Sequence, residues 1–163
     1  MYASASALNW SSNAFSVYYF CVLSANMSSS ATLLVVDDNE AHRYYVCRTL
    51  DAVGFHCVAA GTGNEALTHA QDHPDLVLLD VHLPDMSGFE VCRKLKSDPA
   101  TAKIPIVMFS AISQDGSVVN DAMQLGVISF LFFPMSEQHL IAVASGALSR
   151  STKKTEGSTT ASS

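Results

Sequence analysis

The 163-residue chain is poor in charge, and what charge it carries is mostly negative. Only 15% of its residues are charged, and nine Lys and Arg stand against fifteen Asp and Glu, for a formal net charge of −6. Non-specific binding of nucleic acid needs a basic surface, which this composition disfavours. Attachment to an anionic membrane surface through basic residues is disfavoured for the same reason. We therefore expect neither nucleic acid nor membrane among the partners.

Cysteine is also sparse. The four cysteines are Cys21, Cys47, Cys57 and Cys92, and no two of them form a C-x-x-C pair. A disulfide framework or a zinc site would need more cysteines or closely spaced pairs. We expect reduced thiols in a cytoplasmic protein. The three later cysteines are expected to fill space in the core, because free cysteine behaves as a small buried hydrophobe.

The two ends of the chain differ in composition from its middle. Residues 1–30 contain no charged residue, and nine of them are serine. The apolar run from Ala14 to Ala25 is shorter than the roughly 20 residues of a membrane-spanning helix, and no basic region precedes it as in a secretory signal. We expect 1–30 to be a disordered or wrongly assigned extension, with Met27 as an alternative start. A signal peptide and a segment lying on a membrane are the alternatives. Residues 149–163, rich in Ser and Thr, are expected to form a disordered tail.

Between these ends, from Thr32 to Leu148, short apolar runs alternate with amphipathic segments. The runs predict strands, at Thr32–Val36, His56–Ala59, Asp75–Leu79, Ile106–Phe109 and Val127–Phe132. The first of them, Thr32–Val36, has the continuous apolar pattern of a strand buried on both faces. The segments between and after them predict helices, at Asn39–Val53, Gly63–Asp72, around Phe89, Cys92 and Leu95, at Gly116–Leu125 and at Glu137–Leu148. Five such units with short connections predict one α/β domain over 31–148, with a parallel sheet covered by helices on both faces.

Acidic residues follow two of the predicted strands. Asp37 and Asp38 come directly after the first strand, and Asp80 comes directly after the third. In open parallel sheets, ligands bind beyond the carboxyl ends of the strands, near the point where strand order reverses. We therefore expect the three carboxylates to share one pocket. The alternative is that they merely end strands on a solvated edge.

Three carboxylates in one pocket repel each other unless one keeps a proton or together they hold a cation. Oxygen ligands without a nearby set of His and Cys favour a hard ion, Mg²⁺ or Mn²⁺. A carboxylate beside such an ion can attack a phosphoryl donor and become an aspartyl phosphate. The pattern thus predicts phosphoryl chemistry at this edge of the sheet.

The middle of the chain resembles a response-regulator receiver domain over roughly Ala31–Leu148. The segments that carry the resemblance are LLVVDDNEAHR, PDLVLLDVHLPDMSGFEVCRKLK, IPIVMFSA and GVISFLFFP. The resemblance implies a flavodoxin-like (βα)5 fold with a doubly wound five-stranded sheet. It also implies a phosphoprotein of a two-component system and not an enzyme, with a histidine kinase or histidine phosphotransfer protein as phosphoryl donor.

The same resemblance implies a set of site residues. Asp80 would be the phosphoacceptor, and Asp37, Asp38 and Asp80 would hold Mg²⁺ together with the backbone carbonyl of His82. Ser110 would be the switch hydroxyl and Phe130 the switch aromatic. Ala111 and Pro134 would line the phosphoryl pocket. The signal would leave through the face between the fourth and fifth predicted helices, toward a protein target or a second copy of the chain.

One residue departs from the family pattern. The family normally has Lys directly before this proline, and here the residue is Phe133. Phosphorylation adds roughly −1.5 to −2 charges, and two unit charges about 4 Å apart attract by on the order of 4 kcal/mol at an effective dielectric near 20, before desolvation. Because Phe133 cannot supply that attraction, we predict weaker retention of the phosphoryl group or weaker coupling to Ser110. Mg²⁺ would then be the main neutralising group.

Alternative functions remain open from the residues. The chain is either a phosphorylation-controlled binding module or a degenerate receiver that acts as a scaffold without phosphorylation, which Phe133 favours. An aspartyl-phosphate phosphohydrolase of the haloacid-dehalogenase type is disfavoured, because that class needs a second Asp where this chain has His82. A flavin carrier is disfavoured because the loop after the first strand is acidic.

Overall fold

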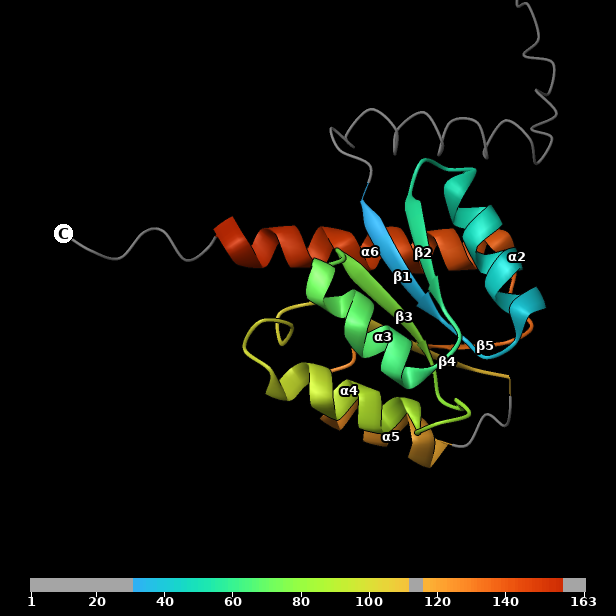
Figure 1. Cartoon of the computed structure of the whole chain (residues 1–163). Helices are drawn as coiled ribbons and strands as arrows, with labels where there is room; N and C mark the ends of the chain where they lie inside the picture. The colour runs from blue at the N-terminus through green and yellow to red at the C-terminus, as the bar shows by residue number, and fades with distance from the viewer. Residues whose placement is uncertain (1–30, 112–115, 157–163) are drawn as a thin grey trace, which may run out of the picture. The chain divides into compact units, whose positions relative to one another are not determined.

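Five short apolar segments form one parallel sheet in the computed structural model, which describes residues 31–111 and 116–156 (Figure 1). The two strands β3 and β4 are buried at every residue, which explains why their sequences are continuous apolar runs. The strand order is β2-β1-β3-β4-β5, the doubly wound flavodoxin-like arrangement predicted from the sequence. The strands are β1 (Thr32–Val36), β2 (His56–Ala60), β3 (Leu76–Asp80), β4 (Ile106–Ser110) and β5 (Ser129–Phe132).

Helices connect the strands, and several of them begin at a residue whose side chain caps the helix, Ser136 in the case of the last one. The side chains of Asn39, Thr62 and Ser87 each accept a hydrogen bond from the backbone N–H three residues later, which satisfies one of the free donors at a helix start. The helices are α2 (Glu40–Asp51), α3 (Gly63–His69) with the 3₁₀ turn η1 (Ala70–Asp72), α4 (Gly88–Ser97), α5 (Gly116–Gln124) and α6 (Glu137–Glu156).

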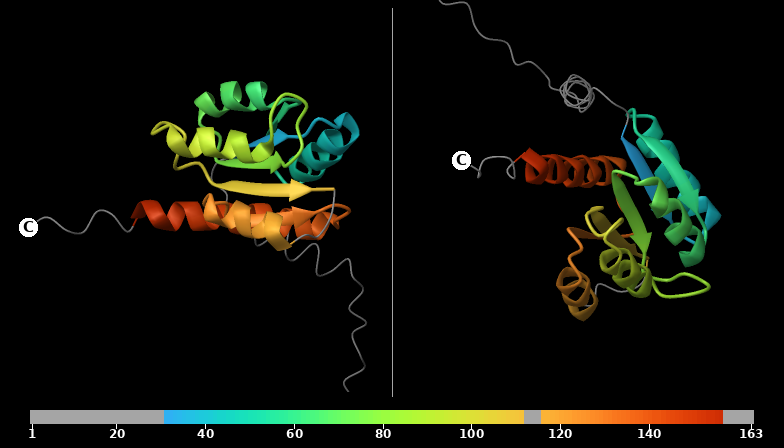
Figure 2. Two further views of the ribbon diagram at one scale, coloured as in Figure 1. Left: turned by 90° about the horizontal axis from the view of Figure 1, so that it is seen from below. Right: turned by 60° about the vertical axis from the view of Figure 1, so that its left-hand side comes forward.

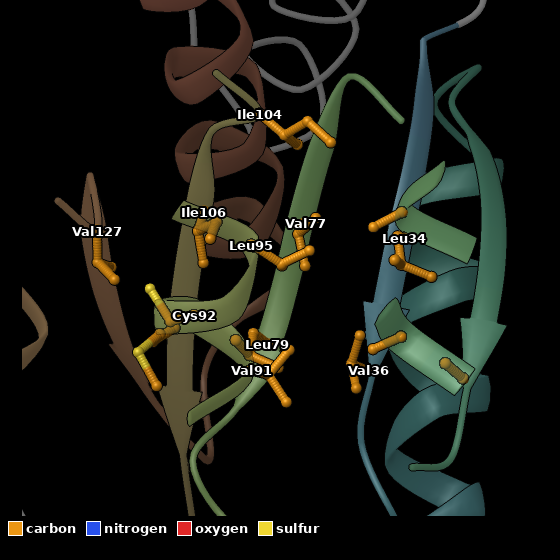
Figure 3. Packing of buried hydrophobic residues seen from close by; sticks show 14 of the residues in the cluster. Leu34, Val36, Val77, Leu79, Val91, Cys92, Leu95, Ile104, Ile106 and Val127 are labelled. Atoms are coloured by element: carbon orange, nitrogen blue, oxygen red, sulfur yellow. The ribbon is translucent and has the colours of Figure 1, made fainter. Parts of the chain in front are cut away.

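The helices cover both faces of the sheet, so the core has two halves. In Figure 1, α3 and α4 lie in front of the sheet and α6 passes behind it, and Figure 2 shows the sheet between these layers. The front half of the core is drawn in Figure 3, where strand residues Leu34, Val36, Val77, Leu79 and Ile106 meet Val91, Cys92 and Leu95 of α4. On the other side, α2 and α6 contact each other and bury Val46, Leu50, Leu140 and Ala144.

Several predicted boundaries shift by one or two residues, and the end of the closing helix shifts further. The last strand begins at Ser129 and not at Val127, because the turn at Leu125 and Gly126 ends α5 and the Val127 N–H still donates back to the Ala122 carbonyl. The closing helix runs to Glu156, whereas the sequence placed its end at Leu148 and assigned 149–163 to a disordered tail. Once packing of Leu140 and Ala144 has fixed a helix, each further residue adds one backbone hydrogen bond at little cost, even in a polar segment. The expectations for 1–30 and 157–163 lie outside the described residues.

The three cysteines of the described chain are unbonded thiols. Cys92 of α4 is fully buried in the core, as predicted, but Cys47 and Cys57 are only partly buried. They lie at the contact between α2 and β2, close to the edge of the sheet. Cys21 lies outside the described residues. No helix within the described ranges is both long and apolar enough to cross a bilayer.

Candidate functional site

The three carboxylates meet where the strand order reverses. Strands β1 and β3 are neighbours and pair Val36 with Leu79, so the next residues of each chain segment, Asp37 and Asp80, stand side by side. One carboxylate oxygen from each of Asp37, Asp38 and Asp80 lies within 4.8 Å of the others. The sequence prediction that these residues share one pocket is thereby confirmed.

Burial makes this pocket electrostatically costly. Burial is the largest cause that raises the pKa of Asp80 to about 6, and repulsion from the Asp37 carboxylate adds to it. The backbone N–H groups of His82 and Val81 donate to the Asp80 carboxylate and partly oppose the rise. Burial also raises the pKa of Asp37, against the hydrogen bond from the Asn39 N–H and the attraction of His42. The cluster holds negative charge that its own surroundings only partly neutralise.

The donor set fits a hard divalent cation. One oxygen of Asp37, Oδ1, accepts a hydrogen bond of 2.8 Å from the Asn39 N–H, but Oδ2 is buried and has no hydrogen-bond partner. A buried carboxylate oxygen without a partner is costly unless a ligand completes it. Because the ligands are all carboxylate oxygens, Mg²⁺ or Mn²⁺ suits them better than a soft metal. That the backbone carbonyl of His82 joins them stays a prediction.

A tight loop after β3 fixes the backbone of Asp80. The N–H of Gly88 donates to the Val81 carbonyl at 2.8 Å, and His82 pairs with Ser87 across the loop. A side chain at position 88 would collide with the backbone carbonyl oxygen of Asp80. Glycine is therefore required here by close approach of two chain segments.

Asp85 ties the same loop to the neighbouring helix, and sequence reasoning missed it. Its carboxylate accepts hydrogen bonds from the Gly63 N–H at 2.8 Å and the Asn64 N–H at 2.9 Å, the first residues of α3. These bonds lower the pKa of Asp85. The contact joins segments far apart in the chain, so the local pattern around Asp85 held no signal for it.

The predicted switch residues lie on β4 and β5. Ser110 is buried at the end of β4, and its carbonyl accepts a hydrogen bond of 3.0 Å from the Phe133 N–H. Phe130 is half-buried, packs against the core under α5 and lies 5.0 Å from Phe132, measured between ring centroids. Ala111 follows Ser110 and is exposed.

Phe133 lies on the other face of the sheet, toward the acidic pocket. Strand pairing aligns Asp80 with Phe109 and Phe109 with Leu131, and Phe133 comes two residues later. Its ring meets Phe109 edge-on at 5.4 Å, and the peptide bond to Pro134 is cis. The position of the family lysine is thus filled by an aromatic ring.

His42 is the second residue that sequence reasoning missed. Its imidazole stacks on Phe133 with a centroid distance of 5.1 Å and an interplanar angle of 6°. Its Nδ1 lies 3.6 Å from Oδ2 of Asp37. Only the packing of α2 against the end of β5 brings these residues together, so a one-dimensional pattern cannot show it.

Comparison with known proteins agrees with this geometry. A family model described as "Response regulator receiver domain" matches residues 33–145. The response regulator PleD of Caulobacter vibrioides is 41% identical over 114 residues, and the match covers 69% of this chain and 25% of PleD. The phosphate regulon transcriptional regulatory protein PhoB of Pseudomonas aeruginosa is 33% identical over 120 residues, with 73% of this chain and 52% of PhoB covered.

Solved structures extend the likeness to the fold. The chemotaxis response regulator CheY4 of Vibrio cholerae superposes with a TM-score of 0.69 at 27% identity, and the match covers 73% of this chain and 99% of CheY4. This chain therefore spans about a quarter of PleD and half of PhoB, but nearly all of CheY4. The family match, the strand order and the acidic pocket agree, and the chain belongs to the response regulator receiver domain family.

Proposed function

We propose that the chain is a phosphoacceptor module that takes a phosphoryl group on Asp80 in a Mg²⁺-dependent reaction. The observation that carries the proposal is the cluster of Asp37, Asp38 and Asp80 at the reversal of strand order, with one buried carboxylate oxygen left without a partner. Family membership supports a signalling role and not an enzyme acting on an external substrate.

The chemistry follows from the ionised form of Asp80. A carboxylate oxygen of Asp80 attacks the phosphorus of a phosphohistidine on the donor protein, a histidine kinase or a histidine phosphotransfer protein. The new P–O bond forms as the P–N bond breaks, and the released imidazole takes a proton from solvent. Mg²⁺, when held by the three carboxylates, supplies positive charge at the phosphoryl oxygens. The Val81 and His82 N–H groups orient the Asp80 carboxylate.

Ser110 and Phe130 would transmit the new charge. The phosphoryl group would draw the Ser110 hydroxyl inward, and Phe130 would turn toward the space behind it. We assign the output surface to the face of α5, β5 and α6, where a protein target or a second copy of the chain would bind. A cytoplasmic location completes the proposal, because the described thiols are unpaired, as is usual in reducing surroundings.

The test uses the full chain, Mg²⁺ and acetyl phosphate. Intact mass spectrometry should show one added phosphoryl group on the parent and none on Asp80→Asn. Asp72→Asn, which changes an exposed aspartate of η1, should label like the parent. Labelling of Asp80→Asn, or Mg²⁺-independent labelling of the parent, would contradict the proposal.

Phe133 supports a second candidate, a receiver that binds its partner without phosphorylation. A phenyl ring provides no charge to hold a phosphoryl group. This function predicts that the parent binds Mg²⁺ but gains no phosphoryl mass, while Phe133→Lys becomes labelled. Labelling of the parent at a rate equal to Phe133→Lys would exclude it.

A further inference from the structure

The search for a replacement of the missing lysine leads to α2. Of the two basic side chains that face Asp37 from this helix, Arg43 is already engaged, because its guanidinium donates to the backbone carbonyl of Asp37 at 2.6 Å. His42 is not engaged in this way. Its Nδ1 lies 3.6 Å from Asp37 Oδ2, slightly beyond hydrogen-bond distance.

Asp37 Oδ2 is the oxygen that lacks a partner, and its two lone pairs allow it to accept one hydrogen bond and still bind a cation. Oδ1 of the same carboxylate already accepts from the Asn39 N–H, so the two oxygens are held unequally. A carboxylate that binds a metal is normally oriented by a hydrogen bond from a neighbouring group. The imidazole N–H of His42 needs to move by only a few tenths of an ångström, in the order of ordinary side-chain motion, to supply that bond.

Phe133 determines where the imidazole lies. The two rings are nearly parallel, and Phe133 is itself fixed by the edge of Phe109 and by its backbone bond to Ser110. The side chain of His42 is 40% exposed, and its stack on Phe133 limits how far the ring can turn. A lysine at position 133 would offer no aromatic surface for this contact.

We propose that His42 is a positioning residue that orients Asp37 for the divalent cation, and that Phe133 holds the imidazole in place for this task. The inference rests on the proposed metal site and deepens it. The family lysine would place its charge directly at the phosphoryl group. In this chain His42 would instead donate a hydrogen bond to Asp37, a ligand of the proposed metal site. His42 is consequently important for cation affinity before any phosphoryl group is present.

The test measures Mg²⁺ and Mn²⁺ affinity of the full chain by isothermal titration calorimetry near neutral pH. His42→Ala should weaken binding by about 10–100-fold. His42→Asn should recover part of the affinity, because its amide nitrogen occupies nearly the position of the imidazole Nδ1 although it cannot stack on Phe133. Tyr44→Ala, on an exposed residue of the same helix, is the matched control and should bind like the parent.

A second variant tests the role of the stack. Phe133→Leu keeps an apolar side chain but removes the parallel ring, and it should weaken binding less than His42→Ala does. The double variant should be no weaker than His42→Ala alone, within roughly twofold, because both changes remove one interaction. Urea unfolding of each variant verifies that the chain is folded during the titrations.

The outcomes separate this inference from the proposed function. If the parent and His42→Ala bind Mg²⁺ equally, or if His42→Asn binds as weakly as His42→Ala, the positioning role is overturned while the metal site stands. If the parent binds neither cation, the metal site and this inference fail together.

Discussion

Asp80 is held in surroundings that disfavour its charged form. Burial and the neighbouring Asp37 raise its pKa from 3.8 to about 6. An acid whose pKa is raised on folding binds its proton more tightly in the folded state. The resulting stabilisation is complete below about pH 4 and is lost as the pH rises through about 6. At neutral pH the metal-free protein therefore carries an unfavourable charge at the residue that the proposed reaction uses.

Removing that charge should stabilise the metal-free protein. We expect Asp80→Asn to raise the free energy of unfolding at neutral pH by up to about 3 kcal/mol, the value for a shift of about two pKa units. The difference from the parent should shrink as the pH falls through about 6 and should be small below about 4. Urea unfolding with a chelator, at a series of pH values, measures it. A difference that does not change with pH, or a loss of stability at neutral pH, would show that desolvation is not the dominant effect.

The cysteines provide a second prediction at this scale. The interaction with the Cys57 thiol lowers the pKa of Cys47, whereas burial raises the pKa of Cys92. Because the thiolate is the reactive form, a lower pKa makes a thiol more reactive near neutral pH. Among these three thiols we expect iodoacetamide to modify Cys47 first in the folded chain. Peptide mass mapping at low labelling measures the order, and the preference should disappear in urea. Faster labelling of Cys92 would contradict the assignment.

At the scale of elements, the connection from β3 to α4 is the most constrained part of the site. Gly88 begins α4 and lies against the backbone of Asp80, so the start of the helix and the proposed phosphoacceptor form one structural unit. The capping bonds of Ser87 at α4 and of Asp85 at α3 add to this constraint. Changes in this loop should therefore affect both stability and the pocket.

Gly88→Ala should destabilise the fold by about 1–3 kcal/mol, because the added carbon must push the Asp80 backbone away. It should also weaken Mg²⁺ binding, since that backbone carries Asp80, one of the proposed Mg²⁺ ligands. Gly146→Ala is the matched control: it lies in α6 with open space around it and should stabilise by about 0.5–1 kcal/mol. Denaturant unfolding and calorimetry compare the two. Equal stability of Gly88→Ala and the parent would mean that the loop yields without cost.

Several of these elements were predictable from the chain alone. The boundaries of β1 and the starts of α3, α5 and α6 agree with the predictions, because apolar runs and a following capping residue are local signals. The end of α6 was not predictable, since it depends on packing that starts well before Glu156. The predicted start of α2 at Asn39 lies within one residue of the observed start, because the Asn39 cap is a local signal.

At the scale of the whole molecule, the proposed cation site would couple cation binding to folding. A ligand that binds only the folded chain stabilises it by RT ln(1 + [L]/Kd), about 2.7 kcal/mol at one hundred times Kd. The three carboxylates come from β1 and β3 and meet only when the sheet forms, so the unfolded chain has no such site.

We therefore expect saturating Mg²⁺ to raise the midpoint of urea unfolding of the parent, and a chelator to reverse the shift. Asp37→Asn should lose most of the effect, because Asp37 supplies the buried oxygen without a partner. Asp75→Asn, at the opposite end of β3, should keep it. A Mg²⁺ shift of the same size in Asp37→Asn would place the cation elsewhere.

The sequence by itself determined the order of strands and helices and the acidic residues that end β1 and β3. These features depend on local patterns of apolar residues and on the rule that parallel strands expose their carboxyl ends at one edge. It also identified Phe133 as an exception, because the residue directly before Pro134 can be compared with the family lysine from the sequence alone.

Only the tertiary structure decided what surrounds those residues. The stack of His42 on Phe133 and the hydrogen bonds from α3 to Asp85 join segments that are distant in sequence. The burial of the unpartnered Asp37 oxygen also depends on the folded structure. Their geometry is set by how α2, β5 and the β3–α4 loop pack against the sheet. A side chain's partners and its degree of burial depend on that packing, so the electrostatics of the pocket cannot be read from composition or spacing.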